Sequence, residues 1–130
     1  MGPVNWLAVV LAAFLAVAVG IVWHGPLFRS GRPLLEGEGA GPRSYLPSIV
    51  VMLIGSAMLG HNFARIGAET LAAKPWLYFM QSGGVAIAFV MPALWLAYAR
   101  FGLTGRQRAL ELAYTLIAWL AMGAVFWIMA

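Results

Sequence analysis

Four apolar stretches follow one another along the chain, and short segments between them hold most of the charged residues. Within each stretch the apolar residues are continuous and do not alternate with polar ones, which argues against the strands of a membrane barrel. A helix of about 20 residues, rising about 1.5 Å per residue, crosses the roughly 30 Å of bilayer hydrocarbon. We therefore predict an all-α integral membrane four-helix bundle that forms a single transmembrane domain over residues 1–130. The predicted helices cover residues 4–23, 45–64, 76–99 and 109–129.

Composition supports a lipid environment, because 63% of the residues are hydrophobic, 9% are charged and the mean hydropathy is +0.88. Soluble domains carry about 25% charged residues. The net charge of +4 does not indicate nucleic acid as a partner, because the basic residues stand singly at the ends of the apolar stretches. No Lys or Arg precedes the first stretch, so we expect it to be a retained helix and not a cleaved signal peptide.

The distribution of basic residues predicts the orientation. Six of the eight lie in or beside the first and third loops, over residues 25–44 and 100–108. Lys and Arg are enriched on the cytoplasmic side of membrane proteins. We therefore expect these two loops in the cytoplasm and both termini outside, on the periplasmic side. The six are Arg29, Arg32, Arg43, Arg100, Arg106 and Arg108, whereas the second loop holds Arg65 and Lys74.

Small residues recur every four positions along three of the apolar stretches, which places them on one face of each helix. In lipid, helices associate largely through close backbone approach along such faces. We expect these stripes to carry the helix packing. They are Ala8, Ala12, Ala16 and Gly20 in the first helix, Ser56 and Gly60 in the second, and Gly84 and Ala88 in the third.

Polar residues within the apolar stretches are candidates for function, because burying them in lipid is costly. Glu111 and Tyr114 share one helix face with Arg108, and this cluster is either a route for protons or substrate or, in the favoured interpretation, an ion pair with a belt tyrosine. Three others would lie near the outer face, where they either line a vestibule or form interhelical hydrogen bonds. The candidates are Asn5, His24, Asn62, Gln81, Glu111 and Tyr114.

The two histidines, His24 and His61, would lie near opposite membrane faces. At about 1.5 Å per residue their depths differ by roughly 25 Å, so they cannot clamp one haem within a subunit. Each follows a small residue four positions earlier, which would leave space for a flat pigment bound by a single histidine. Ordinary hydrogen bonding at the interface is the favoured interpretation, and we expect no cofactor.

The sequence offers no Gly-rich phosphate loop, paired catalytic carboxylates, metal-spaced histidines or nucleophile elbow. It also contains no cysteine, which excludes disulfides and thiolate chemistry. We therefore expect a protein that is not an enzyme. A local structural signal lies before the fourth stretch, where Thr104 and Gln107 have the spacing of a helix capping box.

Several short motifs resemble the family called domain of unknown function 1761. That family begins with N-W-x-A-V, has a first helix ending in G-x-x-W-Y-G-P-L-F, and opens its final helix with an acidic residue and a tyrosine. The chain departs from this pattern twice: His24 stands where the family usually has tyrosine, and Glu111 replaces aspartate. The matching residues here are Asn5-Trp6, Gly20, Trp23 to Phe28, Phe101-Gly102, Arg106, Glu111 and Tyr114.

The resemblance implies a small bacterial-type four-helix membrane protein and supplies no activity. It also makes His24 a poor metal ligand, because tyrosine and histidine share only a polar tip on an apolar ring. We expect Trp23 and His24 to anchor the helix at headgroup depth, and Gly25 and Pro26 to end it.

Our leading hypothesis is a non-enzymatic accessory or structural subunit of the bacterial inner membrane. It would pack against other transmembrane subunits, or against copies of itself as a homo-oligomer, within the lipid bilayer. The first alternative is a small transporter or channel that uses Asn62, Gln81, Glu111 and Pro92. The second is a haem or pigment binder through a single histidine, His24 or His61.

Overall fold

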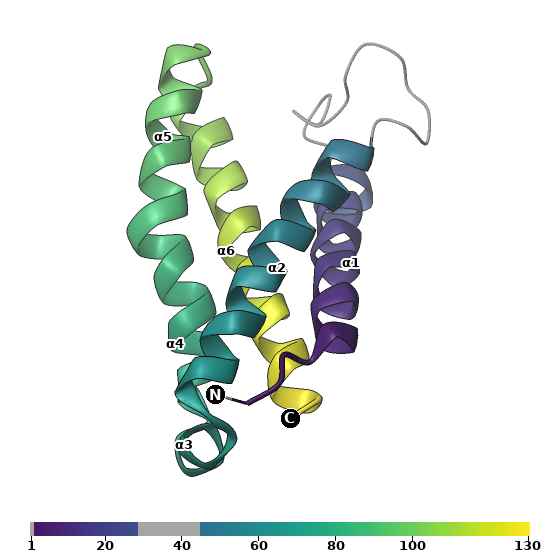
Figure 1. The fold of residues 1–130 in the computed structure, drawn as a ribbon. Helices are drawn as coiled ribbons and strands as arrows, with labels where there is room; N and C mark the ends of the chain where they lie inside the picture. Colours follow the sequence, from purple (N-terminus) through teal and green to yellow (C-terminus); the bar gives the residue numbers. More distant parts are fainter. Residues whose placement is uncertain (1, 29–44) are drawn as a thin grey trace.

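The computed structural model describes residues 2–28 and 45–130, and the regular elements in these ranges are all helices (Figure 1). Four helical rods are long and apolar enough to cross a membrane. The all-α membrane bundle is thereby confirmed. Most of the first predicted loop, with Arg29, Arg32 and Arg43, lies outside the described residues. In chain order the elements are α1 Trp6–Val22, the π-helical turn η1 Trp23–Leu27, α2 Leu46–Ile66, α3 Ala68–Ala73, α4 Trp76–Val85, the π-helical turn η3 Ala86–Val90, α5 Met91–Arg100 and α6 Gly105–Ile128.

Local capping chemistry sets where two of the rods begin. The side chain of Asn5 accepts a hydrogen bond from the Ala8 N–H at 3.0 Å, so α1 starts at Trp6. The capping box of Thr104 and Gln107 is confirmed, since each side chain bonds the backbone N–H of the other. Helix α6 therefore starts at Gly105, four residues before the predicted start at residue 109.

The first rod continues past the residues that we expected to end it. Gly25 and Pro26 lie inside η1, and the Phe28 N–H donates to the Trp23 carbonyl, five residues back, at 3.1 Å. Proline has no N–H and clashes with the carbonyl four residues earlier, and a widened turn accommodates both defects. The extra turn keeps His24 within the helical rod.

The central pair of the bundle is α1 and α6, which run side by side (Figure 1). Helix α2 packs on α1, and α4 packs on α6. At the end of the bundle that holds both chain termini, α2 also contacts α3 and α4. Toward the other end α5 packs on α6 and diverges from α2, and no residue of α5 is buried. The bundle is therefore closed at the terminal end and splayed at the other.

The stripe on α1 lies in the centre of the bundle. Its three alanines are completely buried, and Gly20 is also buried. On α2, a Cβ added at Gly60 would lie 2.9 Å from the Val9 side chain of α1, so glycine lets α1 pack closely on α2. The buried Ser56 hydroxyl donates to the Val9 carbonyl at 2.8 Å. Small residues let α1 and α2 come within hydrogen-bonding reach of one another.

The stripe expected on the third rod does not face the bundle. Ala88 is exposed, and nothing lies within 4 Å of a Cβ added at Gly84. The rod packs instead through Ser82 and Gly83, which are buried against α6. The four-residue spacing of Gly84 and Ala88 selected the wrong face, because spacing groups residues into faces but does not show which face meets a neighbouring helix.

Candidate functional site

His24 and Glu111 meet at the end of the bundle opposite the chain termini. The Nε2 atom of His24, in η1, lies 3.0 Å from both carboxyl oxygens of Glu111, in the second turn of α6. The His24 side chain is 5% exposed and that of Glu111 is 12% exposed. Within the described residues, this is the one contact between a basic ring and a carboxyl group inside the bundle.

The second ring nitrogen of His24 fixes how protons are arranged in this pair. Nδ1 lies 2.9 Å from the Gly20 carbonyl, which can only accept, so Nδ1 carries a hydrogen and donates it. Nε2 then faces the Glu111 carboxyl group, and a hydrogen bond there needs one more proton. Either an imidazolium donates to a carboxylate, or a carboxylic acid donates to the neutral ring. The two side chains therefore share one proton between α1 and α6.

Tyr114 completes the site from the next turn of α6. Its ring meets the His24 ring edge to face, with centroids 4.9 Å apart and planes at 72°, and it is buried. A Cβ at Gly20 would lie 2.9 Å from the Tyr114 hydroxyl, so glycine at this position lets the ring lie close against α1. Gly20, the last small residue of the stripe on α1, thus leaves space for the Tyr114 ring beside His24.

Arg108 does not form the ion pair that the sequence suggested. Its guanidinium carbon lies 4.3 Å above the Trp95 ring of α5, while the Glu111 carboxyl group turns to His24. Spacing of three residues puts Arg108 and Glu111 on one side of α6, but a partner from another helix holds the carboxyl group. Tyr114 likewise is a buried residue of the helix interface and not a belt tyrosine.

Of the polar residues expected near the outer face, only Asn5 lines the cavity found at the terminal end of the bundle. Asn5 caps α1 and donates from Nδ2 to the Met129 carbonyl at 3.2 Å, which ties the two chain termini together. Asn62 and Gln81, both half-buried, are not among the residues that line this cavity. This cavity is therefore not a vestibule formed by all three residues.

The two histidines lie at opposite ends of the bundle, in different surroundings. Both ring nitrogens of His24 are engaged, so it has no free nitrogen for a metal or haem. His61 is exposed, bonds the Ala57 carbonyl through Nδ1 at 2.9 Å, and meets the Trp6 ring at 5.8 Å. Its Nε2 is the ring nitrogen left for a ligand. Across residues 2–28 and 45–130 no three histidine or acidic side chains cluster as a metal site.

Sequence reasoning missed the contact between His24 and Glu111, which lie 87 residues apart in the chain. The two positions at which the chain departs from the family pattern, histidine for tyrosine and glutamate for aspartate, are the two partners. Nothing in the spacing of either helix taken alone could show it.

The fold and this site define a multi-pass, all-α membrane protein whose central helices are joined by a buried polar pair. The chain belongs to the family described as protein of unknown function, DUF1761, whose model matches residues 7–127. The membership expected from the short motifs is therefore confirmed. Comparison with curated proteins gave no match, and neither did comparison with solved structures.

Proposed function

We propose that this chain is a non-enzymatic accessory or structural subunit of the cell membrane, which works by packing against other transmembrane helices. The proposal rests on the exposure of α5. It covers part of α6 but has no buried residue of its own, and its Leu96 side chain is 64% exposed. A helix so weakly held within the subunit is suited to packing against a partner.

The buried pair supports the same proposal. It joins α1 to α6 by a hydrogen bond shared between two helices, which fixes how one helix lies along the other. A rigid central pair would hold α5 in place for a partner. Nε2 of His24 bonds Glu111 across the two helices and Nδ1 bonds the Gly20 carbonyl within the first rod, so both ring nitrogens serve to position the helices.

Cross-linking in native membranes tests the proposal, and the chain's lack of cysteine makes single-cysteine variants clean. Leu96→Cys places a thiol on α5, and Phe14→Cys, at a residue 52% exposed on α1, is the matched control. We expect a discrete adduct from Leu96→Cys and none from Phe14→Cys. An adduct of twice the 14.0 kDa chain mass identifies a homo-oligomer, and any other mass identifies a different subunit.

Extraction of the protein in mild detergent gives a measurement that could contradict the proposal. A lone 14.0 kDa chain in every mild detergent, with no adduct specific to α5, would overturn the proposed function. Equal adducts from both cysteine positions would do the same, because they would reflect random collisions in the bilayer.

A second candidate is a small transporter or channel, and the shared proton of His24 and Glu111 is the observation that favours it. Proton flux into liposomes under an imposed membrane potential is its test. Flux that falls in Glu111→Gln, which removes the ionisable group and retains the shape, would support transport. Flux equal to that of empty liposomes would exclude it.

A third candidate is a haem or pigment binder through His61. An absorption spectrum of the purified protein tests it.

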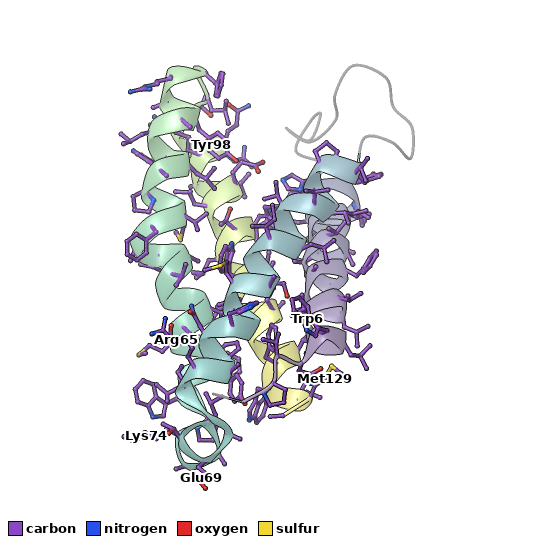
Figure 2. The ribbon with its side chains drawn as sticks, viewed as in Figure 1. Trp6, Arg65, Glu69, Lys74, Tyr98 and Met129 are labelled. Atoms are coloured by element: carbon purple, nitrogen blue, oxygen red, sulfur yellow. The ribbon has the colours of Figure 1, made fainter. Side chains whose placement is uncertain are left out.

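The proposed orientation places the terminal end of the bundle outside the cell. The charged residues Arg65, Glu69 and Lys74 gather toward this end (Figure 2). Cysteines introduced at Lys74 and Arg106 report the sidedness when intact cells are treated with an impermeant maleimide. We expect labelling of Lys74→Cys and protection of Arg106→Cys, and the reverse pattern would invert the orientation.

A further inference from the structure

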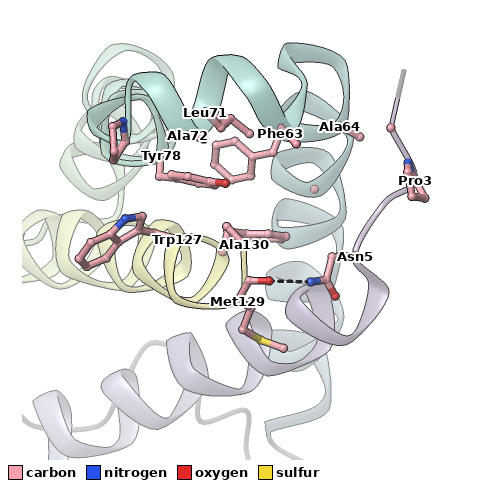
Figure 3. Close-up of a pocket in the computed structure, with 15 residues that line it drawn as sticks. Pro3, Asn5, Phe63, Ala64, Leu71, Ala72, Tyr78, Trp127, Met129 and Ala130 are labelled. Atoms are coloured by element: carbon pink, nitrogen blue, oxygen red, sulfur yellow. Dashed lines mark hydrogen bonds between the residues drawn. The ribbon is translucent and has the colours of Figure 1, made fainter.

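A cavity of about 570 Å³ lies at the terminal end of the bundle, away from the His24 and Glu111 site (Figure 3). The last turns of α2 and α6, the short helix α3 and the start of α4 form its walls, together with the segment before α1. Its volume falls within the range of about 300–1,000 Å³ seen for pockets that hold small-molecule ligands. The cavity is therefore large enough to be a binding site.

The walls of the cavity are fixed by the fold and are not a chance gap between rods. Gly67, with φ of 90°, ends α2 and lets the chain turn directly into α3. The Gly2 N–H donates to the Ala64 carbonyl at 3.1 Å, and the Asn5 amide donates to the Met129 carbonyl at 3.2 Å. Each of these contacts holds one wall of the cavity to another.

The lining indicates an uncharged ligand with an aromatic or similarly apolar body. None of the described lining residues has an acidic or basic side chain. The Phe63 ring packs against Tyr78 at 4.8 Å and against Phe126 at 5.1 Å, which forms an aromatic wall. Such a surface binds apolar rings and excludes ions, because it offers nothing to replace their hydration.

Two polar side chains line this largely apolar space, those of Asn5 and Tyr78. The Asn5 amide already bonds the Met129 carbonyl and the Ala8 N–H. Tyr78 is 6% exposed, and its ring lies across the cavity with the hydroxyl pointing inward, between Phe63 and Ala130 (Figure 3). A pocket that is mostly apolar with a single well-placed hydroxyl recognises a molecule with one hydrogen-bonding group on an apolar body. Trp127 lines the mouth, and tryptophan is typical of the interface between hydrocarbon and headgroups.

We propose that the cavity bounded by Phe63, Leu71, Tyr78 and Phe126 is a binding site for a small uncharged ring compound with one hydroxyl or carbonyl group. Such a molecule concentrates at the membrane interface, and the cavity opens at that level. The ligand's body would pack on the aromatic wall, and the Tyr78 hydroxyl would bond its polar group.

Photolabelling of the whole chain in lipid nanodiscs tests this site. The probe is a trifluoromethyl-diazirine derivative of benzyl alcohol, and the corresponding benzoic acid is its charged counterpart. We expect the alcohol to label peptides of α3, α4 and the end of α6, and an excess of plain benzyl alcohol to compete. The benzoate should give no competable labelling.

Substitutions at two adjacent residues of α3 supply the matched comparison. Ala72 lines the cavity, whereas Ala73, equally exposed, is not among the lining residues. Ala72→Phe fills the cavity and should abolish competable labelling, and Ala73→Phe should leave it unchanged. Both variants should elute as the wild type does on sizing. Equal labelling in the two variants would overturn the proposal.

Tyr78→Phe tests the polar contact without filling the cavity. Loss of one hydrogen bond of about 0.5–1.5 kcal/mol should weaken competition by benzyl alcohol about 2- to 10-fold and leave toluene, which has no hydroxyl, unchanged. A phospholipid that remains bound to the wild type in native mass spectrometry and is lost from Ala72→Phe would overturn the proposal, because an acyl chain would then be the occupant.

Discussion

The two ends of this bundle hold their helices together by different means. At one end a buried histidine and a partly buried glutamate join α1 to α6, and α5 has no buried residue beside them. At the other end α2, α3, α4 and α6 converge with the chain termini, and aromatic rings and backbone hydrogen bonds make the contacts. The second end has more neighbouring elements and yet encloses a cavity of about 570 Å³.

The difference shows what each kind of contact can do in lipid. A polar pair joins two helices through a few atoms, so it specifies alignment without filling space. Aromatic side chains fill space but meet imperfectly where several elements converge, so a void remains. Between the two ends, completely buried alanines on α1 allow the neighbouring helices to approach it closely.

The largest loss of stability is expected at Gly123, where α6 lies close to the backbone of α4. A Cβ at Gly123 would lie 2.9 Å from the Tyr78 carbonyl oxygen, which belongs to the backbone and cannot swing aside. We expect Gly123→Ala to lower the free energy of unfolding by about 3 kcal/mol, the upper end for overpacking. Thermal unfolding in mild detergent measures it.

Gly84→Ala is the control for this substitution, since its new Cβ meets nothing within 4 Å. It should be neutral or stabilise the protein by up to about 1 kcal/mol, as alanine favours a helix over glycine. A destabilisation of similar size in both variants would show that the predicted close approach does not exist.

The next effect isolates the polar pair at the open end. His24→Phe and Glu111→Leu each leave one buried polar partner unsatisfied, whereas the double variant removes both. We expect a coupling energy of about 1.5 kcal/mol, in the middle of the range for residues in one network. Unfolding of the four proteins of this cycle gives the value, and strictly additive effects would contradict the contact.

A smaller effect should arise from the ring that packs beside the pair. In Gly20→Ala the new methyl group meets the edge of the Tyr114 ring, which can shift slightly. We expect a loss of about 1 kcal/mol, the low end for overpacking. Adding Tyr114→Phe removes the nearest atom, the hydroxyl oxygen, and should restore part of the stability. If Tyr114→Phe lowers the stability of Gly20→Ala further, the new methyl group does not clash with the Tyr114 hydroxyl.

The smallest loss of stability is expected for a substitution in the middle of the bundle. Ser56→Ala removes the hydroxyl that donates to the Val9 carbonyl. The expected loss is about 0.6 kcal/mol, which is the mean for interhelical hydrogen bonds in membranes. The same unfolding assay measures it, and a loss as large as that of Gly123→Ala would mean that the hydroxyl does more than this one bond.

The sequence by itself determined the four rods, the capping box before α6 and the family. Uninterrupted apolar runs can only be helices in lipid, because their backbone groups must bond within the segment. The capping box at Thr104 and Gln107 is likewise a contact over three residues, so local spacing defines it. Predictions of this kind need no knowledge of neighbouring helices.

Tertiary structure alone decided which residues meet across helices. Spacing placed Glu111 near Arg108, but His24, 87 residues away, holds the carboxyl group. It placed Gly84 on the packing face, whereas the rotation of α4 against α6 brings the adjacent Gly83 to the contact. The cavity beside the short helix α3 also arises only where chain segments from both termini converge. Helical periodicity assigns a residue to a face, and only packing assigns that face to a neighbour.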